Sequence, residues 1–418
     1  MAILPARARE SIYSGRAAGY GADMKNWLQT GSLTLFFTAA LAGCGGEPGN
    51  PDDAAGGTDD GVVDSNGADV VAPTGVPFVY VGGSGNLIHV FRLNVSDGSL
   101  TPVGSPVDAG TNPTFLAVSP DHTTLFAVNE ASGSSAAVAS FHIDPKTGAL
   151  QFLSRVSSKG DGPAHVGTDR KGKFAFVANY GGGTVAVLPI NATGALGDAV
   201  DTHDHGGTSA HPHEVVVDPA NKFAFVPNLG LDSVTSYALD ATTGKLTDSG
   251  AGALKLPGGS GPRHMDFHPT APFAYVIDEL NSTIGALSYD AAKGKLTSLQ
   301  ILSTLPAGFQ GSNTCAEVQV APSGKFVYGS NRGHDSIVTF SIGADGKLSL
   351  VGDQSTMGKT PRHFQIEPSG KILLAANQDS GNIVTFFVDT KKGTLKPTGK
   401  TVSIASPEYV GVVYLAPH

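Results

Sequence analysis

Short runs of alternating apolar and polar residues recur along this chain, separated by turns rich in glycine and proline. The clearest run recurs about every 46 to 53 residues, and most copies end at Asn or Asp. The copies are Phe78–Val81, Leu125–Asn129, Phe174–Asn179, Phe223–Asn228, Phe273–Asp278, Phe326–Asn331 and Ile372–Asn377. Alternation predicts β-strands, and this repeat length is typical of propeller blades of four strands.

The surroundings of each run predict the rest of the blade. A short strand introduced by Pro precedes most copies, as at Pro163 and Pro262, and turns such as 243–246 (Thr-Gly-Lys-Leu) lead to an outer strand. The first copy lacks its Pro-led strand, whereas a spare one, Pro407–Tyr414, follows the last copy. We therefore expect an all-β fold, a seven-bladed β-propeller with four-stranded antiparallel blades, whose ring the C-terminal strand closes by joining blade one.

Composition agrees with this prediction. The chain has 55 Gly and 26 Pro, which are turn residues, and the repeat region lacks long helical periodicity. The net charge of −9 is spread along the chain without a basic stretch, which argues against nucleic acid as a partner. We expect a monomer.

The N-terminal part predicts export. A charged start at Met24–Lys25 is followed by an apolar run, small residues and Cys44, a pattern that resembles a bacterial lipoprotein signal with its lipobox. We expect three regions: a signal region 1–44, a tether 45–76 rich in Gly, Asp and Pro, and the propeller 77–418. The resemblance implies lipidation of Cys44 in the cell envelope. The membrane contact would be this lipid anchor alone, at the outer membrane, because Gly rather than Asp follows Cys44.

Other polar groups predict no metal or cofactor. Once Cys44 is lipidated, Cys315 is the remaining cysteine, so an internal disulfide is ruled out, and we interpret Cys315 as a small core residue. The run 203–205 (His-Asp-His) lies in a Gly-rich segment rather than on a rigid strand, so we predict no metal site there. We expect no organic cofactor.

Two positions of every blade should open on one mouth of the channel, the start of the inner strand and the end of the second strand. The residues after the inner-strand Pro are Thr114, Ala164, His213, Arg263, Ala316, Arg362 and Glu408, and the next ones are Phe115, His165, Glu214, His264, Glu317, His363 and Tyr409. The residues that close the second strands are Ser84, Glu130, Tyr180, Leu229, Glu279, Arg332 and Gln378. Because these residues differ from blade to blade, they suggest a site rather than a structural repeat.

Among these residues we predict catalytic roles for His213, Arg263, Glu279 and Arg332. We predict substrate-binding roles for His165, His264, Arg362, Glu130, Tyr180 and Gln378. Strict alternation along an inner strand leads us to expect that only one of two consecutive residues faces the channel and that the other faces into a blade.

Several motifs together resemble the seven-bladed propeller lactonase family, which includes the propeller-type 6-phosphogluconolactonases and the carboxy-muconate lactonizing enzymes. They are 261–265 (Gly-Pro-Arg-His-Met), 279–282 (Glu-Leu-Asn-Ser), 178–181 (Ala-Asn-Tyr-Gly), 228–232 (Asn-Leu-Gly-Leu-Asp), 316–317 (Ala-Glu), 330–333 (Ser-Asn-Arg-Gly) and 335–337 (Asp-Ser-Ile). The resemblance covers residues 77–416 and implies an active site of His213, Arg263, Glu279 and Arg332 without metal. The chain departs from the family pattern at Glu214 and Asn228, which puts the substrate contacts of blade four in doubt.

The resemblance implies a lactonase that opens, or forms, the ring ester of a small anionic sugar-derived or dicarboxylate lactone, as a 6-phosphogluconolactonase does. Arginines can hold an anionic group and the charge that develops on the carbonyl oxygen, and Glu279 or His213 can serve as acid or base. Which of the two is the base stays open. The alternative is a non-enzymatic surface propeller used for binding, because segments such as 176–180 also resemble cell-surface propellers with repeats of the Tyr-Val-Thr-Asn type.

Overall fold

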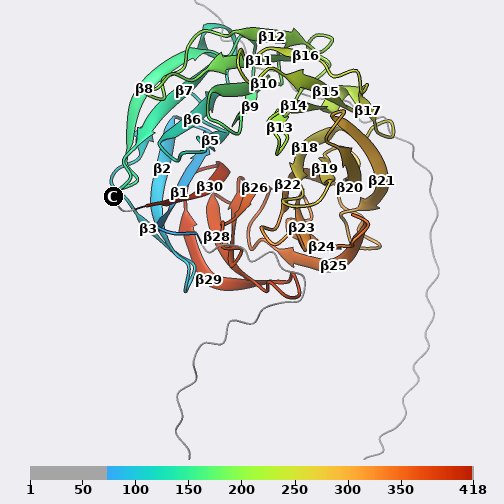
Figure 1. Cartoon of the computed structure of the whole chain (residues 1–418). Helices are drawn as coiled ribbons and strands as arrows, with labels where there is room; N and C mark the ends of the chain where they lie inside the picture. The colour runs from blue at the N-terminus through green and yellow to red at the C-terminus, as the bar shows by residue number, and fades with distance from the viewer. Residues whose placement is uncertain (1–72, 417–418) are drawn as a thin grey trace, which may run out of the picture. The chain divides into compact units, whose positions relative to one another are not determined.

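The computed structural model of the chain describes residues 73–416 (Figure 1). The predicted signal region with Cys44 and nearly all of the tether lie outside the described residues. Within residues 73–416 no helix is long and apolar enough to cross a membrane.

The described residues form seven antiparallel sheets around a central axis, which confirms the predicted seven-bladed propeller (Figure 1). Blade one contains β30 (Pro407–Leu415), β1 (Val76–Gly83), β2 (Leu87–Asn94) and β3 (Ser99–Pro102), with β4 (Val107–Asp108) beside β2. Blade two contains β5 (Leu116–Val118), β6 (Thr124–Asn129), β7 (Ala137–Ile143) and β8 (Leu150–Ser157), and blade three β9 (Pro163–Thr168), β10 (Phe174–Asn179), β11 (Thr184–Pro189) and β12 (Asp201–Asp204). Blade four contains β13 (Val216–Val217), β14 (Phe223–Asn228), β15 (Ser233–Leu239) and β16 (Leu246–Asp248), with β17 (Leu254–Lys255) beside β15.

The last three blades are the most regular. Blade five contains β18 (Pro262–Phe267), β19 (Phe273–Asp278), β20 (Thr283–Asp290) and β21 (Lys295–Ser303). Blade six contains β22 (Thr314–Val320), β23 (Phe326–Arg332), β24 (Ser336–Ile342) and β25 (Leu348–Ser355), and blade seven β26 (Pro361–Ile366), β27 (Ile372–Asn377), β28 (Asn382–Val388) and β29 (Leu395–Ser403). Two short 3₁₀ turns, Gly133–Ser135 and Leu229–Leu231, connect second to third strands.

The C-terminal strand closes the ring as predicted. β30 pairs antiparallel with β1 along its whole length, from Val76 opposite Leu415 to Gly83 opposite Pro407. The first and last strands of the propeller therefore share one sheet, and the inner edge of blade one is not left as an open edge strand.

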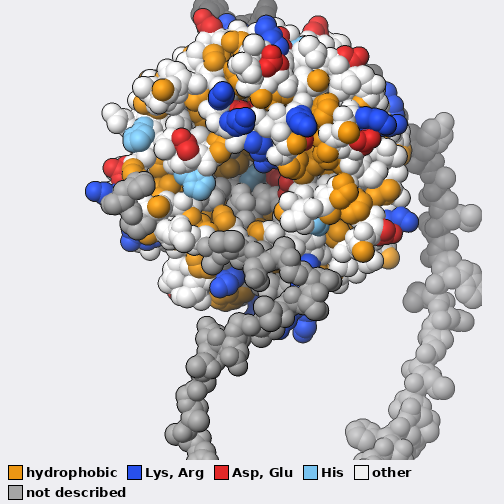
Figure 2. Space-filling model, in the orientation of Figure 1, with side chains coloured by type: hydrophobic (Ala, Val, Ile, Leu, Met, Phe, Trp, Pro, Cys, Tyr) orange, Lys and Arg blue, Asp and Glu red, His pale blue; other side chains and the backbone are white. Residues whose placement is uncertain are grey.

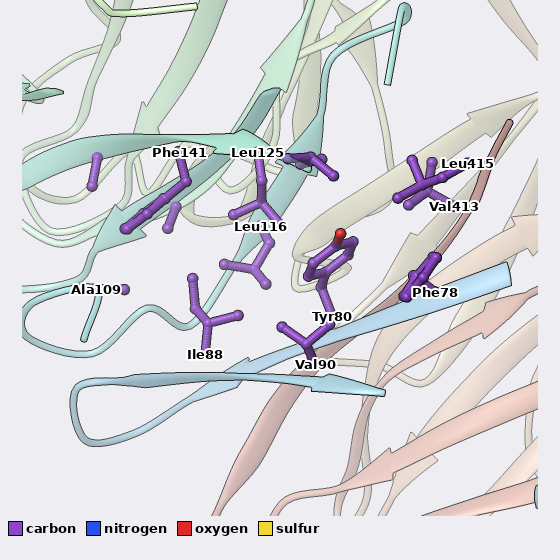
Figure 3. Close-up of a cluster of buried hydrophobic side chains, with 13 residues drawn as sticks. Phe78, Tyr80, Ile88, Val90, Ala109, Leu116, Leu125, Phe141, Val413 and Leu415 are labelled. Carbon is purple, nitrogen blue, oxygen red and sulfur yellow. The ribbon is translucent and has the colours of Figure 1, made fainter. Parts of the chain in front are cut away.

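The hydrophobic core is divided among the contacts between neighbouring blades. Each of the seven contacts buries its own cluster of apolar side chains. Figure 3 shows the cluster between blades one and two, where Phe78 and Tyr80 of β1 face Leu125 of β6 and Phe141 of β7. Because every blade packs against two neighbours, the ring holds the seven inner strands at fixed positions around the axis.

A glycine turn of one blade packs against an aromatic ring of the preceding blade. Gly346 has φ +77°, and a Cβ there would lie 2.4 Å from Cδ1 of Phe273. The carbonyl of Gly346 also accepts a hydrogen bond from the Tyr275 hydroxyl at 3.1 Å. The predicted Gly-Lys-Leu turns are therefore contact points between blades as well as turns.

Candidate active site

In blades one, three, five and seven the residue after the inner-strand Pro is an extra residue in a β-bulge. In β18, Pro262 pairs with Asp278 and His264 pairs with Ile277, so Arg263 has no partner across the ladder. A β-bulge inserts one residue and re-aims the side chains next to it.

The bulges turn consecutive side chains toward the channel. Arg362 of β26 and Glu408 of β30 are skipped in the ladder in the same way as Arg263. One small cavity in the channel is lined by both members of three consecutive pairs: Thr114 and Phe115, Arg263 and His264, and Arg362 and His363. The expected strict alternation is therefore wrong at Arg263 and His264 and at Arg362 and His363, where a bulge shifts the register by one residue. Thr114 and Phe115 precede β5 and are outside its ladder.

Glu279 lies between two arginines from different blades. Its Oε2 atom is 3.0 Å from Nε of Arg263, and its Oε1 atom is 3.1 Å from Nη2 of Arg332. Arg263 is 3% exposed, and burial together with the two neighbouring arginines lowers its pKa to about 9, so the guanidinium remains charged at neutral pH. Glu279 therefore compensates two buried positive charges with one carboxylate.

Two consecutive backbone carbonyls fix the same arginines. The Cys315 carbonyl accepts from Nη2 of Arg332 at 2.8 Å, and the Ala316 carbonyl accepts from Nη1 of Arg263 at 2.6 Å. Both residues lie at the irregular register of β22, where Cys315 pairs with Asn331 and the next regular pair starts at Val318. In a regular strand such backbone carbonyls accept hydrogen bonds from the neighbouring strand. The bulge leaves them able to accept from the two arginines instead. Cys315 itself is buried, as predicted for a core residue.

His213 contributes a neutral imidazole to this cluster. Burial and the charges of nearby arginines, first Arg263, lower its pKa well below the usual range. Its Nδ1 atom is buried and finds no hydrogen-bond partner among residues 73–416. The ring packs edge-on against Tyr180, with 5.4 Å between centroids, and against His264 at 5.1 Å. Buried polar atoms in proteins nearly always have a hydrogen-bond partner, so the unpaired nitrogen sets His213 apart from a purely structural histidine.

These side chains line a polar cavity of about 190 Å³ at one mouth of the channel. Its lining residues are Glu130, Ala164, Tyr180, His213, Glu279, Arg332 and Arg362. The predicted convergence of residues from separate blades is therefore found for most of the proposed site residues. In the space-filling view, charged and histidine side chains gather around the centre of the ring (Figure 2).

Two further charged residues of the lining, Arg362 and Glu130, also have partners within the protein. Arg362 lies 3.0 Å from Glu408, with the distance between Nε and Oε2, and Glu408 also accepts from the Ser84 hydroxyl. Glu130 accepts a hydrogen bond from the Thr114 hydroxyl. Each cavity arginine thus already has a carboxylate partner within the protein.

Some predicted residues lie outside this cavity. Arg263 and His264 line the small cavity of about 10 Å³ instead, and they are 3% and 1% exposed. His165 is buried beside Phe115, with ring centroids 4.4 Å apart. Gln378 is half-buried directly after β27, where its backbone N–H donates to the Thr360 carbonyl. The structure therefore does not bring His165 or Gln378 to the cavity lining.

The prediction of site residues missed Glu408 and Glu317. Glu408 holds Arg362, and Glu317 contacts two buried histidines, as described below. Both residues stand in the same two inner-strand columns as the predicted residues, and Glu408 is the one Glu of its column, so the signal for finding them was present in the sequence.

The described residues offer no set of ligands for a metal. Among residues 73–416 no three His, Cys, Asp or Glu side chains are grouped so as to hold an ion. His203 is paired with Asp201 at 3.0 Å, and the Tyr237 hydroxyl lies 3.2 Å from His205. The polar side chains that line the cavity supply carboxylate, guanidinium, imidazole and phenol groups.

Comparisons with known proteins place this arrangement in a family. The family model "Lactonase, 7-bladed beta-propeller" matches residues 78–412. A 6-phosphogluconolactonase of Bacillus subtilis is 33% identical over 293 residues, which are 68% of this chain and 82% of the relative. A 6-phosphogluconolactonase of Pectobacterium carotovorum is also 33% identical, over 62% of this chain and 77% of the relative. The solved structure of a periplasmic gluconolactonase of Pseudomonas aeruginosa has a TM-score of 0.75 and 32% identity, covering 81% of this chain and 99% of that one. The chain belongs to the lactonase family of seven-bladed β-propellers.

Proposed function

We propose that this protein is a lactonase that hydrolyses the ring ester of a sugar-derived lactone in the cavity lined by His213, Glu279, Arg332 and Arg362. The observation that carries the proposal is the pairing of a neutral imidazole, whose Nδ1 has no partner among the described residues, with a buried cluster of arginines held by Glu279. Relatives named as 6-phosphogluconolactonases and a structural neighbour named as a gluconolactonase support it.

His213 is the better candidate for the base. Both oxygens of Glu279 are engaged by arginines, at 3.0 and 3.1 Å, so a proton on Glu279 would weaken two ion pairs. The low pKa of His213 leaves its imidazole neutral and able to accept a proton at neutral pH. In this role His213 takes a proton from water as the water oxygen attacks the lactone carbonyl carbon. It then returns the proton to the ring oxygen when the C–O bond breaks.

The arginines act on the charge that develops during this reaction. Attack of water turns the carbonyl oxygen into an oxyanion, and preorganised donors in a site shielded from water stabilise such a charge strongly. Nε of Arg332 is a buried donor without a hydrogen-bond partner in the described part of the chain. Glu279 and the Cys315 carbonyl hold the other end of this guanidinium, so the donor is already oriented before the substrate binds.

The charge balance of the cavity favours a neutral, polyhydroxylated lactone. Arg263 and Arg332 share Glu279, and Arg362 is paired with Glu408, so protein carboxylates already balance most of the positive charge that would attract a phosphate or carboxylate. The carboxylate of Glu130 in the lining instead suits the hydroxyl groups of a sugar. The volume of about 190 Å³ lies below the usual range for drug-sized ligands, as expected for a single ring.

An anionic lactone is the second candidate. The two arginines in the lining, Arg332 and Arg362, are residues that bind carboxylate and phosphate groups in pairs of hydrogen bonds. Relatives named as 6-phosphogluconolactonases favour this candidate. A phosphorylated substrate is harder to reconcile with export.

We further propose that the protein is lipidated at Cys44 and works in the bacterial cell envelope, at the outer membrane. The lipobox-like run that ends at Cys44 supports this location, as does the neighbour described as periplasmic. An exported lactonase would meet sugar lactones outside the cytoplasm.

A panel of lactones tests the proposed function. The purified full chain is mixed with glucono-1,5-lactone, 6-phosphogluconolactone and carboxy-substituted γ-lactones, and acid release is followed above the spontaneous rate. We expect hydrolysis of the neutral sugar lactone with the highest kcat/KM. If none of these lactones is opened, the binding propeller becomes the better interpretation of the fold.

A further inference from the structure

A buried layer of rings and carboxylates lies directly under the active-site cavity. It consists of the second inner-strand residues: Phe115, His165, Glu214, His264, Glu317, His363 and Tyr409. The Phe115 ring contacts His264, His363 and Tyr409, with centroids 5.7, 5.5 and 4.8 Å away. These contacts restrict the imidazoles to one orientation each.

Glu317 holds two of these imidazoles with one oxygen atom. Its Oε2 lies 2.8 Å from Nδ1 of His264 and 3.3 Å from Nε2 of His363. Burial lowers the pKa of both histidines, to about 3 for His363, so both rings are neutral. Oε2 can therefore accept an N–H from each ring, whether or not the other oxygen of the carboxyl group carries a proton.

The far side of His264 faces an active-site arginine. Nη1 of Arg263 lies 3.3 Å from Nε2 of His264. A guanidinium only donates, so Nε2 must carry the lone pair and Nδ1 must carry the proton, which then points at Glu317. The bonds run in one direction, from Arg263 to His264 and from His264 to Glu317.

The backbone of Ala316, the residue before Glu317, also binds Arg263. The Ala316 carbonyl accepts from Nη1 of Arg263 at 2.6 Å. The other ring, His363, follows Arg362 directly in β26, at the same bulge position that Arg263 and His264 occupy in β18. Glu317 is thus linked to Arg263 through the hydrogen bonds of His264. It is linked to Arg362 through His363, the next residue of β26.

We propose that Glu317 is a positioning residue for the proposed lactonase reaction, which holds Arg263 through His264 and steadies Arg362 through His363. It does not touch the substrate, because it lies under the cavity rather than in its lining. The inference rests on the proposed function only for its kinetic test.

The cost of burying this carboxylate supports a functional role. Glu317 is 6% exposed, and burial raises its pKa to about 8. Its Oε2 atom contacts imidazoles rather than a Lys or Arg, so the charged form is poorly compensated and the carboxyl group largely carries a proton at neutral pH. Two other blades carry uncharged rings at the equivalent position, Phe115 and Tyr409, and the remaining four carry His165, Glu214, His264 and His363. The fold therefore does not require an ionisable side chain at this position of a blade.

A double-mutant cycle tests the link to Arg263. Glu317→Leu removes both acceptor contacts, and we expect kcat/KM to fall about 10²-fold with most of the loss in kcat, because small displacements of an orienting group have effects of this size. In an Arg263→Lys background, which lacks the Nη1 donor, the same change should cost only a few-fold. Equal losses in both backgrounds would overturn the proposal, since they would indicate a structural effect independent of Arg263.

Glu214→Leu is the matched control. Glu214 occupies the equivalent position in blade four, and its Oε2 accepts the Met265 backbone N–H at 2.6 Å. Its substitution therefore also removes a buried acceptor, but not one linked to Arg263 through an imidazole. We expect its effect on kcat/KM to be the same in both backgrounds. Glu317→Gln, whose amide oxygen can replace Oε2, should recover most of the activity lost in Glu317→Leu and covers the case that the Leu variant does not fold.

The proton position on His264 can be measured without any substrate. Nitrogen NMR of the full chain, assigned with His264→Gln, should show a neutral ring with the proton on Nδ1 in the wild type, and a shift toward the Nε2–H form in Glu317→Leu. A wild-type proton on Nε2 would contradict the proposed network. If no lactone is hydrolysed but the Nδ1–H form is found, the proposed function fails while the network stands.

Discussion

Oε1 of Glu279 lies 3.1 Å from Nη2 of Arg332 although the two residues close the second strands of different blades. The ion pair therefore forms only when blades five and six pack side by side. Arg263, at the other oxygen of Glu279, comes from the inner strand of blade five. The site therefore forms only when the ring of blades has assembled. A change of charge at Glu279 should disturb the guanidinium groups of both Arg263 and Arg332.

Single substitutions of His213 and Glu279 distinguish the residue that acts as the base from the residue that orients the arginines. His213→Asn should lower kcat by about 10²–10⁴ and abolish the acid limb of the pH profile, because the proton acceptor is gone. Glu279→Gln should also lower kcat, because the arginines lose their shared carboxylate, but it should keep the acid limb. Steady-state rates on the best lactone of the panel check both. Loss of the acid limb in Glu279→Gln alone would make Glu279 the base.

The pH dependence should report the low pKa of His213. A base is active when deprotonated, so activity should hold from neutral pH downward and fall only well below the ordinary histidine pKa of about 6.5. Arg362 is among the charges that lower this pKa, so Arg362→Met should move the acid limb to higher pH. Lys400→Met, which removes a charge from an exposed residue near Asp97, should not move it. Profiles of kcat/KM measured across acid and neutral pH check the shift.

Much of the fold could be predicted from the sequence because its repeat is directly visible. The missing inner strand before Phe78 and the spare strand at Pro407–Tyr414 indicated the closure, and β30 does pair with β1. The recurring turn glycines were recognised only as turns. Their contacts with the aromatic ring of the preceding blade, such as Gly346 on Phe273, depend on the packing of blades and leave no local pattern.

The candidate site was predictable in part for a similar reason. Columns of equivalent positions identified Arg263, Glu279 and Arg332, which do converge. The orientation of consecutive residues was not predictable, since a bulge inserts a residue without changing the apolar pattern of the strand. Gln378 stands in a column of site residues but does not reach the lining, because position in the repeat does not fix the direction of a side chain at a strand end.

The contact between blades at Gly346 predicts a stability loss. Gly346→Ala places a methyl group 2.4 Å from the Phe273 ring and keeps a positive φ, so we expect overpacking to cost about 1–3 kcal/mol beyond the backbone strain. Gly250→Ala is the matched control, because Gly250 has φ +72° and no atom within 4 Å of the added Cβ. It should show the backbone strain alone, about 1–2 kcal/mol. Denaturant unfolding measures both, and equal losses would exclude the Phe273 contact as the cause.

Lipidation predicts a label at Cys44. Cells that express the full chain and are fed a radioactive fatty acid should yield labelled protein in the membrane fraction, and Cys44→Ala should abolish the label and release the protein. Cys315→Ala should keep it, because Cys315 is buried in the propeller. Label retained in Cys44→Ala, or a mature chain that starts elsewhere, would show that the N-terminal interpretation is wrong.

The pairing of Arg362 with Glu408 predicts how the substrate preference can be changed. Glu408→Gln removes the carboxylate that lies 3.0 Å from Arg362 and leaves an amide that can still accept the Ser84 hydroxyl bond. The freed guanidinium should then bind an anionic group, so KM for 6-phosphogluconolactone or a carboxy-substituted lactone should fall about tenfold, as expected for a hydrogen bond to a charged group. KM for neutral glucono-1,5-lactone should change little. If the wild type already prefers the anionic lactones and Glu408→Gln leaves that preference unchanged, the arginines accept anions without losing a carboxylate partner, and the anionic lactone becomes the better candidate substrate.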